Sequence, residues 1–227
     1  MKTLIYVPII HTSADLGSLA KDVVKRGIAN LGQEFWEEHK KTVDKFWETI
    51  SDYFDSIDVS GMKIYQDGMV AEGEVGQKIV KESLAAGSKN YEIIDNLLKR
   101  GAILVKTEDF NLVKKEYKKL LAITHAKSII SKLTAFIRYK LTKNKLLNKR
   151  DEFIAKRIVE TSKHSGKGIL FIGAYHNIKT KLLEKFRIIE IKDVNRVREY
   201  QRLLPIYNKY PEQFQEVSKY LASSVKV

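Results

Sequence analysis

The sequence predicts an α/β protein: a mainly parallel sheet flanked by helices, with an inserted basic helical layer between strands three and four. Short apolar runs alternate with longer helical patterns, which is typical of βαβ crossovers. The length of 227 residues suits one large α/β domain. Residues 102–165 contain neither glycine nor proline, which favours uninterrupted helices. We therefore expect a single domain, residues 1–227, containing an inserted basic helical segment at 111–149.

The apolar runs predict five strands. The first, Thr3–Ile10, is rich in β-branched residues and apolar almost throughout, as expected of a strand that is buried on both faces. Most of the others begin or end at glycine-containing turn signals. They are Met62–Tyr65, Ala102–Lys106, Lys167–Ile172 and Arg187–Ile191.

Apolar residues at helical spacing predict the helices between and after these strands. In Gln33–Ile57, for example, Phe46, Trp47, Ile50 and Phe54 lie on one stripe. The predicted helices are Ala14–Asn30, Gln33–Ile57, Glu74–Ala86, Tyr91–Lys99, about Leu112–Leu147, about Arg150–Lys163, Val194–Leu203 and Glu212–Leu221.

The positive charge is concentrated in one part of the chain. The formal net charge is +13, and residues 97–150 account for +12 of it. A nearly neutral domain therefore carries one basic segment. Its partner could be nucleic acid, an anionic membrane surface or an anionic substrate, and a merely solvated helical face is the alternative.

Composition excludes several classes of protein. The absence of cysteine excludes disulfide scaffolds, thiolate metal sites and cysteine nucleophiles. No apolar run approaches the ~20 residues that span a bilayer. Met1–Ile10 lacks the features of a signal peptide, so we expect a cytoplasmic protein. The sequence does not predict an oligomeric state.

Ionisable side chains follow four of the predicted strands. His11, Asp67, Glu108 and His176 each stand where a strand ends. Because ligands of open α/β sheets bind outside the carboxyl ends of the strands, we expect these residues to form a site there.

Each of these residues also has a purely structural interpretation. Asp67 precedes Gly68 and could simply form a turn. Glu108 and the following Asp109 could cap the next helix. A lone histidine is more often structural than functional, but two histidines at matching strand ends favour function. The other histidines, His39, His125 and His164, are interpreted as structural, exposed or ambiguous.

Two kinds of chemistry fit such a set. Two neutral imidazoles and a carboxylate (His11, His176 and Asp67) could hold a divalent metal ion that activates water. Without metal, one histidine could act as a general base oriented by a carboxylate such as Glu108. Either route suits a carbonyl-containing or anionic small molecule or peptide as substrate, and the sequence leaves both open.

Arg150 is the remaining candidate. It shares a helical stripe with Ile154 and Ile158 and is predicted to open its helix. A cation at a helix N-terminus opposes the macrodipole, so an inward-facing Arg150 needs a carboxylate or an anionic ligand. The alternative is an arginine that reaches out to solvent.

The residues around Arg150 and His176 resemble the motifs of a known protein family. Arg150-Asp151-Glu152-Phe153-Ile154-Ala155, followed by a strand and then Gly173-Ala174-Tyr175-His176, resembles the C-terminal signature of TraB/Tiki-type proteins. Asp151 stands where that family has Asn, and Pro8 stands where its first G-x-x-H motif has Gly. The segment Leu97–Glu108 is similar to the family's helix–Gly–strand–Glu segment.

The wider superfamily includes erythromycin-esterase-like and ChaN-like proteins. The resemblance implies a histidine after the first strand, matched by His11, and an acid after the second, matched by Asp67 with Glu72 and Glu74 as later candidates. It implies metal-dependent peptide hydrolysis in Tiki-like members, metal-free ester hydrolysis with a histidine base in erythromycin-esterase-like members, and iron or haem handling in ChaN-like members.

Overall fold

The computed structural model describes residues 2–15, 20–124, 129–162 and 166–226. Its centre is a five-stranded sheet in the order β3-β2-β4-β1-β5, and every pair of neighbouring strands is parallel. The strands are β1 (Lys2–Ile9), β2 (Lys63–Gln66), β3 (Ile103–Val105), β4 (Lys167–Gly173) and β5 (Phe186–Glu190). The predicted fold class is confirmed.

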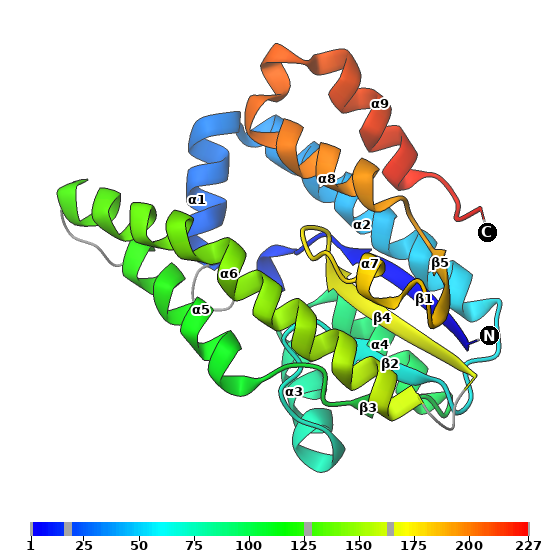
Figure 1. Ribbon diagram of the computed structural model, residues 1–227. Coiled ribbons are helices and arrows are strands. Elements are labelled where there is room, and N and C mark those ends of the chain that lie inside the picture. Colours follow the sequence, from blue (N-terminus) through cyan, green and yellow to red (C-terminus); the bar gives the residue numbers. More distant parts are fainter. Residues whose placement is uncertain (1, 16–19, 125–128, 163–165, 227) are drawn as a thin grey trace.

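Helices connect consecutive strands and cover both faces of the sheet (Figure 1). They are α1 (Ala20–Leu31), α2 (Gln33–Asp55), α3 (Gly73–Ala85), α4 (Lys89–Lys99), α5 (Phe110–Thr124), α6 (Ile129–Thr161), α7 (Lys179–Leu182), α8 (Val194–Leu203) and α9 (Pro211–Ala222), with a 3-10 segment at Leu204–Lys209.

The strand order determines the face that each helix covers. Because βαβ crossovers are right-handed, the connections that run from β1 towards β3 place α1–α4 on one face, and those that run back towards β5 place α5–α7 on the other. The contacts agree: α2 packs against α4 and α9, whereas α6 packs against α5 and α7. Adjacent strands β2 and β4 therefore lead to opposite faces, which opens a crevice between their carboxyl ends.

The core lies between these layers. β1 and β4 are central strands, and their apolar side chains are almost completely buried. Trp47 of α2 donates a hydrogen bond from Nε1 to the Ile10 carbonyl oxygen at 3.1 Å, which ties one helical layer to the end of β1. On the other face, Tyr65 of β2 and Thr161 of α6 share a 2.8 Å hydrogen bond between their hydroxyls.

The predicted boundary between two helices at Arg150 is wrong. α6 runs without interruption from Ile129 to Thr161, so Arg150 lies in its interior and not at its N-terminus. Asn148 could cap a helix here, but no glycine or proline separates Leu147 from Arg150, and the helix continues through Asn148. The predicted single helix at about Leu112–Leu147 is also wrong, because this stretch contributes to two helices, α5 and α6. α5 and α6 pack side by side, and α6 continues onto the sheet (Figure 1).

A smaller difference concerns the predicted helix Ala14–Asn30. Residues 13–15 form a 3-10 turn, stabilised by the Asp15 carboxylate accepting from the Thr12 backbone N–H at 2.6 Å, and α1 begins at Ala20. Across the described ranges, no helix combines the length and the apolar character that crossing a bilayer requires.

Candidate active site

Three of the predicted strand-end residues lie together in the crevice between β2, β3 and β4. Asp67 follows β2, Glu108 follows β3 and His176 follows β4, and Arg150 reaches them from α6. Glu108 is fully buried, and Arg150 and His176 are more than nine-tenths buried. The parallel sheet therefore gathers residues that are more than 100 positions apart in sequence into one charged cluster.

Arg150 is the centre of this cluster. Its Nη2 donates to Asp67 Oδ1 at 2.5 Å, and its Nε donates to the two Glu108 oxygens at 3.0 and 3.2 Å. Nη1 donates to Glu116 of α5. The planar guanidinium offers its donors in a fixed fork, which suits several carboxylates at once. The expected carboxylate partner is present, although the helix-terminus reason for expecting it is wrong.

The carboxylates respond differently to this environment. Burial raises the pKa of Asp67, but the positive charges of His176 and Arg150 outweigh that effect and hold it well below its ordinary value. Burial also raises the pKa of Glu108, and in that residue the nearby Asp67 charge adds to the increase. Asp67 is therefore the firmly ionised member, and Glu108 is the one most readily protonated.

His176 is held from both sides. Its Nδ1 lies 2.5 Å from Asp151 Oδ1, and its Nε2 lies 3.4 Å from Asp67 Oδ2. Asp151 is fully buried on α6, and its second oxygen accepts from the Asn177 backbone N–H at 2.8 Å. The carboxylate of Asp151 thus fixes the orientation of the imidazole ring, as the orienting acid does in a catalytic triad.

The two carboxylates change the protonation of His176. Burial lowers its pKa, but the charge of Asp67 and the hydrogen bond with Asp151 raise the pKa to about 9. The imidazole is therefore cationic around neutral pH, with a proton on each ring nitrogen. The proton on Nε2 is the one aimed at the long contact with Asp67.

The loop after β4 positions His176 in the cluster. The His176 backbone N–H donates to the Gly173 carbonyl oxygen at 3.0 Å, and the Gly173 N–H donates to Asp67 Oδ2 at 3.0 Å. A Cβ on Gly173 would lie 3.0 Å from Asp67 Oδ2 and 3.4 Å from His176 Cδ2. Arg198 of α8 donates to the Ala174 and His176 carbonyl oxygens and holds the loop from the other side.

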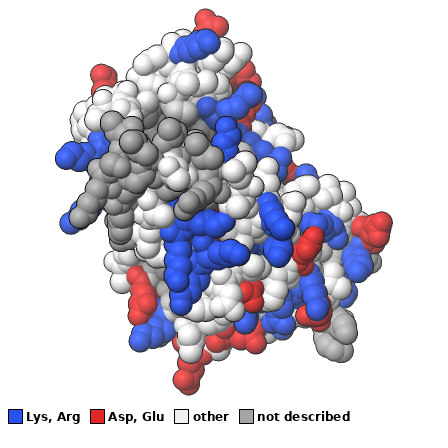
Figure 2. All heavy atoms as spheres, turned by 60° about the vertical axis from the view of Figure 1, so that its left-hand side comes forward, with Lys and Arg blue, Asp and Glu red and all other residues white. Residues whose placement is uncertain are grey.

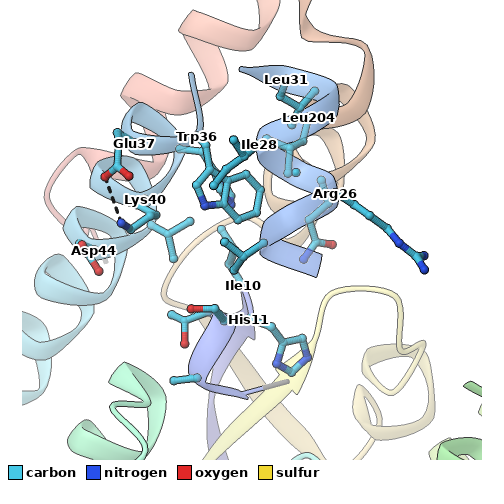
Figure 3. Close-up of a pocket in the computed structure, with 18 of the residues that line it drawn as sticks. Ile10, His11, Arg26, Ile28, Leu31, Trp36, Glu37, Lys40, Asp44 and Leu204 are labelled. Carbon is cyan, nitrogen blue, oxygen red and sulfur yellow. Dashed lines mark hydrogen bonds and ion pairs between the residues drawn. The ribbon is translucent and has the colours of Figure 1, made fainter. Parts of the chain in front are cut away.

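His11 lies apart from the buried cluster. It is exposed at the end of β1 and lines a pocket beside the sheet, yet it remains close enough for its charge to lower the pKa of Asp67. Figure 3 shows its ring over the end of the strand, directed away from the apolar side chains above it. The structure therefore brings Asp67, Glu108, Arg150 and His176 into contact and leaves His11 at the rim.

The residues predicted as metal ligands do not fit a resident divalent ion in this arrangement. A ligating imidazole must be neutral, whereas His176 is held protonated by its carboxylates. Asp67 Oδ1 pairs with Arg150 and Oδ2 accepts from Gly173. Over the described part of the chain, no group of three or more His, Asp or Glu side chains is arranged to hold a metal ion.

The structural interpretations considered for the strand-end residues apply to some of them and not to others. Asp109, not Glu108, caps α5, because its Oδ1 accepts from the backbone N–H groups of Asn111 and Leu112 at 2.9 and 3.0 Å. Asp67 takes part in the cluster and also begins the turn at Gly68, which has a φ of 78°. Of the later candidates, Glu72 bonds the Lys106 backbone, and Glu74 is exposed.

Sequence reasoning missed Asp151 and Glu116 as members of the site. From the sequence, Asp151 was noted only because it stands where the resembling family has Asn. A usable signal was present, since Asp151 stands three and seven residues before Ile154 and Ile158 and therefore shares their inward face. Glu116 gave no such signal, because its contact with Arg150 depends on how α5 packs against α6.

The other histidines play no part in the cluster. His39 of α2 is half-buried and shares a 2.7 Å hydrogen bond through Nδ1 with the Tyr200 hydroxyl. His125 and His164 lie outside the described residues.

Comparisons with known proteins add no family to these observations. No protein-family model, curated protein or solved structure matches the chain.

Proposed function

We propose that the chain is a hydrolase of the TraB/Tiki and erythromycin-esterase-like type that cleaves an ester or amide bond without a resident metal ion. The observation that carries the proposal is the convergence of two cations, Arg150 and His176, on the Asp67 carboxylate at the carboxyl end of a parallel sheet. Preorganised charges of this kind stabilise the transition states of acyl transfer.

In the proposed mechanism His11 is the general base. Its imidazole is exposed and stands at the rim of a pocket that can hold a substrate. It takes a proton from the attacking water as the water oxygen bonds to the substrate carbonyl carbon. Negative charge then develops on the carbonyl oxygen.

His176 is the proposed acid. Because it is cationic around neutral pH, its Nε2–H first stabilises the developing oxyanion and then protonates the leaving oxygen or nitrogen as the C–O or C–N bond breaks. The proton that His11 received returns to His176 through solvent. Asp151 orients the His176 ring, and Arg150 holds Asp67 and Glu108 in position and balances their charge.

The resemblance noted in the sequence supports the metal-free form of this chemistry. The resembling erythromycin-esterase-like proteins use a histidine base for ester hydrolysis, and the donor set here does not fit a divalent ion. An ester is therefore the preferred substrate class, with peptides as the alternative that the resembling Tiki-like proteins suggest.

The test is hydrolysis of a panel of 4-methylumbelliferyl esters with different acyl chains, measured as kcat/KM after exhaustive treatment with a chelator. We expect activity above that of free imidazole, with His11→Ala losing about 10²-fold or more, the usual effect of removing a general base. Tyr175→Phe is the matched control, because Tyr175 is exposed in the His176 loop, and it should stay within about twofold of the wild type.

Two results would contradict the proposal. One is activity in His11→Ala equal to that of the wild type. The other is activity that appears only when a divalent ion is restored to the chelated protein.

A specific observation also favours a second candidate function, the binding of a nucleic-acid backbone. The exposed face of α5 and α6 carries lysines with no ion-pair partner among the described residues: Lys114, Lys115, Lys118, Lys140, Lys143, Lys145 and Lys149. Figure 2 shows Lys and Arg side chains gathered on this side of the molecule. When lysines neutralise phosphates, the counterions condensed on the nucleic acid are released, which makes binding salt-dependent.

Charge-matched variants test this second candidate. Replacing Lys114, Lys115 and Lys118 by Ala should weaken binding to a short DNA duplex at low salt and flatten its salt dependence. Replacing Lys21, Lys25 and Lys41, which are exposed on α1 and α2, changes the net charge equally and should have much less effect. Equal losses in the two triple variants, or no binding at low salt, would remove this candidate.

A further inference from the structure

The backbone on both sides of His11 is held by side chains from outside β1. Before His11, the Ile10 carbonyl oxygen accepts from Trp47 Nε1 of α2 at 3.1 Å. After it, the Thr12 N–H donates to Asp15 Oδ2 at 2.6 Å. The side chain of His11 itself is exposed at the end of the strand (Figure 3). An exposed imidazole therefore stands on a stretch of backbone that is bound on either side.

Asp15 closes a small ring with Thr12. Its Oδ2 also accepts from the Thr12 hydroxyl at 2.9 Å, and its backbone N–H donates to the Thr12 carbonyl oxygen at 3.1 Å. The N–H, the hydroxyl and the carbonyl group of Thr12 are thus all bound to one residue. The spacing matches a capping box, in which an acidic side chain reaches back to the N–H of a Ser or Thr three residues earlier.

The second carboxylate oxygen of Asp15 joins this ring to α4. Oδ1 accepts from the hydroxyl of Ser88, which is buried. Ser88 is the N-cap of α4, and its Oγ accepts from the Tyr91 N–H at 3.3 Å. A carboxylate at this end of a helix is favoured by the helix dipole. Since α4 packs against α2 and α3, one carboxylate connects the loop that carries His11 to the helical layer beneath it.

The place of His11 matters because of what lies next to it. Its charge lowers the pKa of Asp67, so the imidazole lies close to the charged cluster. A general base must come within hydrogen-bond distance of the proton that it takes, and a displacement of about 1 Å can cost about 10²-fold in rate. Because the ring is exposed, its place depends on the backbone that carries it.

From these contacts we infer that Asp15 is the positioning residue of His11. Its carboxylate binds the backbone after His11 and fastens it to α4, which keeps the imidazole in place beside Asp67. The anchoring of the loop depends on the structure alone. Its consequence for the rate rests on the proposed function, in which His11 is the general base.

The anchoring is tested without a substrate, by ¹⁵N relaxation of the backbone. The order parameters of His11 and Thr12 should be about 0.85 in the wild type, as in rigid backbone, and below about 0.6 in Asp15→Ala, as in a chain that moves on the ps–ns timescale. Asp58→Ala is the matched control. Asp58 accepts from the Ser60 N–H at 3.0 Å in the loop before β2, at the opposite edge of the sheet, so its loss should leave His11 unchanged.

The effect on rate is measured as a double-mutant cycle with the best ester substrate. Asp15→Ala should lower kcat about tenfold or more and leave KM within about twofold. In the His11→Ala background the same change should lower kcat by less than about twofold, because no base remains to be misplaced. Asp15→Asn keeps an acceptor oxygen for the Thr12 N–H and should recover most of the loss, and Asp58→Ala should stay within about twofold of the wild type.

A milder variant covers the case in which Asp15→Ala does not fold. Ser88→Ala removes the link to α4 and leaves the ring between Thr12 and Asp15 intact. It should lower kcat several-fold when His11 is present and have little effect in its absence. Circular dichroism checks that each variant is folded.

Equal losses of kcat in the two backgrounds would overturn the inference, because a merely structural role predicts that result. Order parameters at His11 and Thr12 that Asp15→Ala leaves unchanged, or that Asp58→Ala lowers equally, would overturn it too. Failure of the hydrolase proposal looks different: the order parameters fall in Asp15→Ala as expected, while neither the wild type nor any variant hydrolyses an ester.

Discussion

Arg150 allows carboxylates that repel one another to share a buried crevice. Asp67 and Glu108 both accept from Nη2 of its guanidinium, Glu108 also accepts from Nε, and Glu116 accepts from Nη1. Removing one partner of such a network leaves an unpaired charge in a site of low dielectric, which is far more costly than losing a surface pair. Arg150 is therefore primarily a positioning residue, and the buried cation ready to give up a proton is His176.

The protonation of His176 can be measured directly. We expect its imidazole to titrate with a pKa of about 9, because Asp67 and Asp151 favour the charged ring more than burial opposes it. Two-dimensional NMR of the histidine side chains gives the value, and the signal that disappears in His176→Gln identifies the residue. A pKa at or below the ordinary value near 6.5 would contradict the assigned role of acid.

The same shift makes a prediction about stability. Because the folded-state pKa of His176 is raised, its contribution is fully present below the unfolded-state pKa of about 6.5 and is lost as the pH rises through about 9. The free energy of unfolding of the wild type in urea should thus fall between pH 6 and 9.5 by about 2–3 kcal/mol more than that of His176→Gln. Parallel curves for the two proteins would count against the raised pKa.

At the scale of elements, the strand ends were predictable and the helix boundaries were not. Alternating strands and helices imply a parallel sheet, and a parallel sheet brings the residues after its strands to one edge, so Asp67, Glu108 and His176 could be placed together from sequence. The end of a helix depends on caps and tertiary contacts. Asn148, two residues before Arg150, is a residue type that can cap a helix, yet α6 runs through it while packed against α5.

Gly173 links the loop geometry to the charges of the site. In Gly173→Ala the new Cβ would lie 3.0 Å from Asp67 Oδ2, so that carboxylate must give way, and 3.4 Å from His176 Cδ2, at the edge of ordinary van der Waals contact. We expect a loss of about 1–3 kcal/mol in the free energy of unfolding. The pKa of His176 should also fall towards its ordinary value, measured by the same NMR titration.

Gly166 provides the control for this substitution. It lies just before β4, a Cβ there meets no atom within 4 Å, and its φ is not positive. Gly166→Ala should leave both the stability and the His176 titration close to those of the wild type. Equal effects at the two glycines would show that crowding at Asp67 is not the reason Gly173 matters.

For the whole molecule, the structure changes how the net charge of +13 is interpreted. Lysines of α5 and α6 such as Lys114, Lys118 and Lys140 are exposed, while Arg150 of the same segment points inward and completes the buried cluster. The sequence shows where the basic residues lie, but not which of them are exposed and which join the buried cluster. That division depends on which face of α6 meets the sheet, and Arg150 and Asp151, adjacent in sequence, both turn out to be buried there.

The pocket lined by His11 could not be predicted from the sequence, because it too depends on tertiary packing. Its walls come from the end of β1, from α1 and α2, and from α8, near the opposite end of the chain, and no local pattern marks an apolar residue as lining a cavity rather than a core. His11 was predicted as a site residue from its strand end, but its place at the rim of a cavity follows only from how these elements pack.

The central claim is that an acid held cationic at His176 works with a base at His11, and the pH dependence of kcat/KM for the best ester substrate tests it most directly. We predict a bell-shaped profile whose alkaline limb lies near pH 9, where His176 loses its proton, and a slower His176→Gln variant that lacks this limb. A wild-type rate that keeps rising through pH 10, or an alkaline limb that persists in His176→Gln, would contradict the claim.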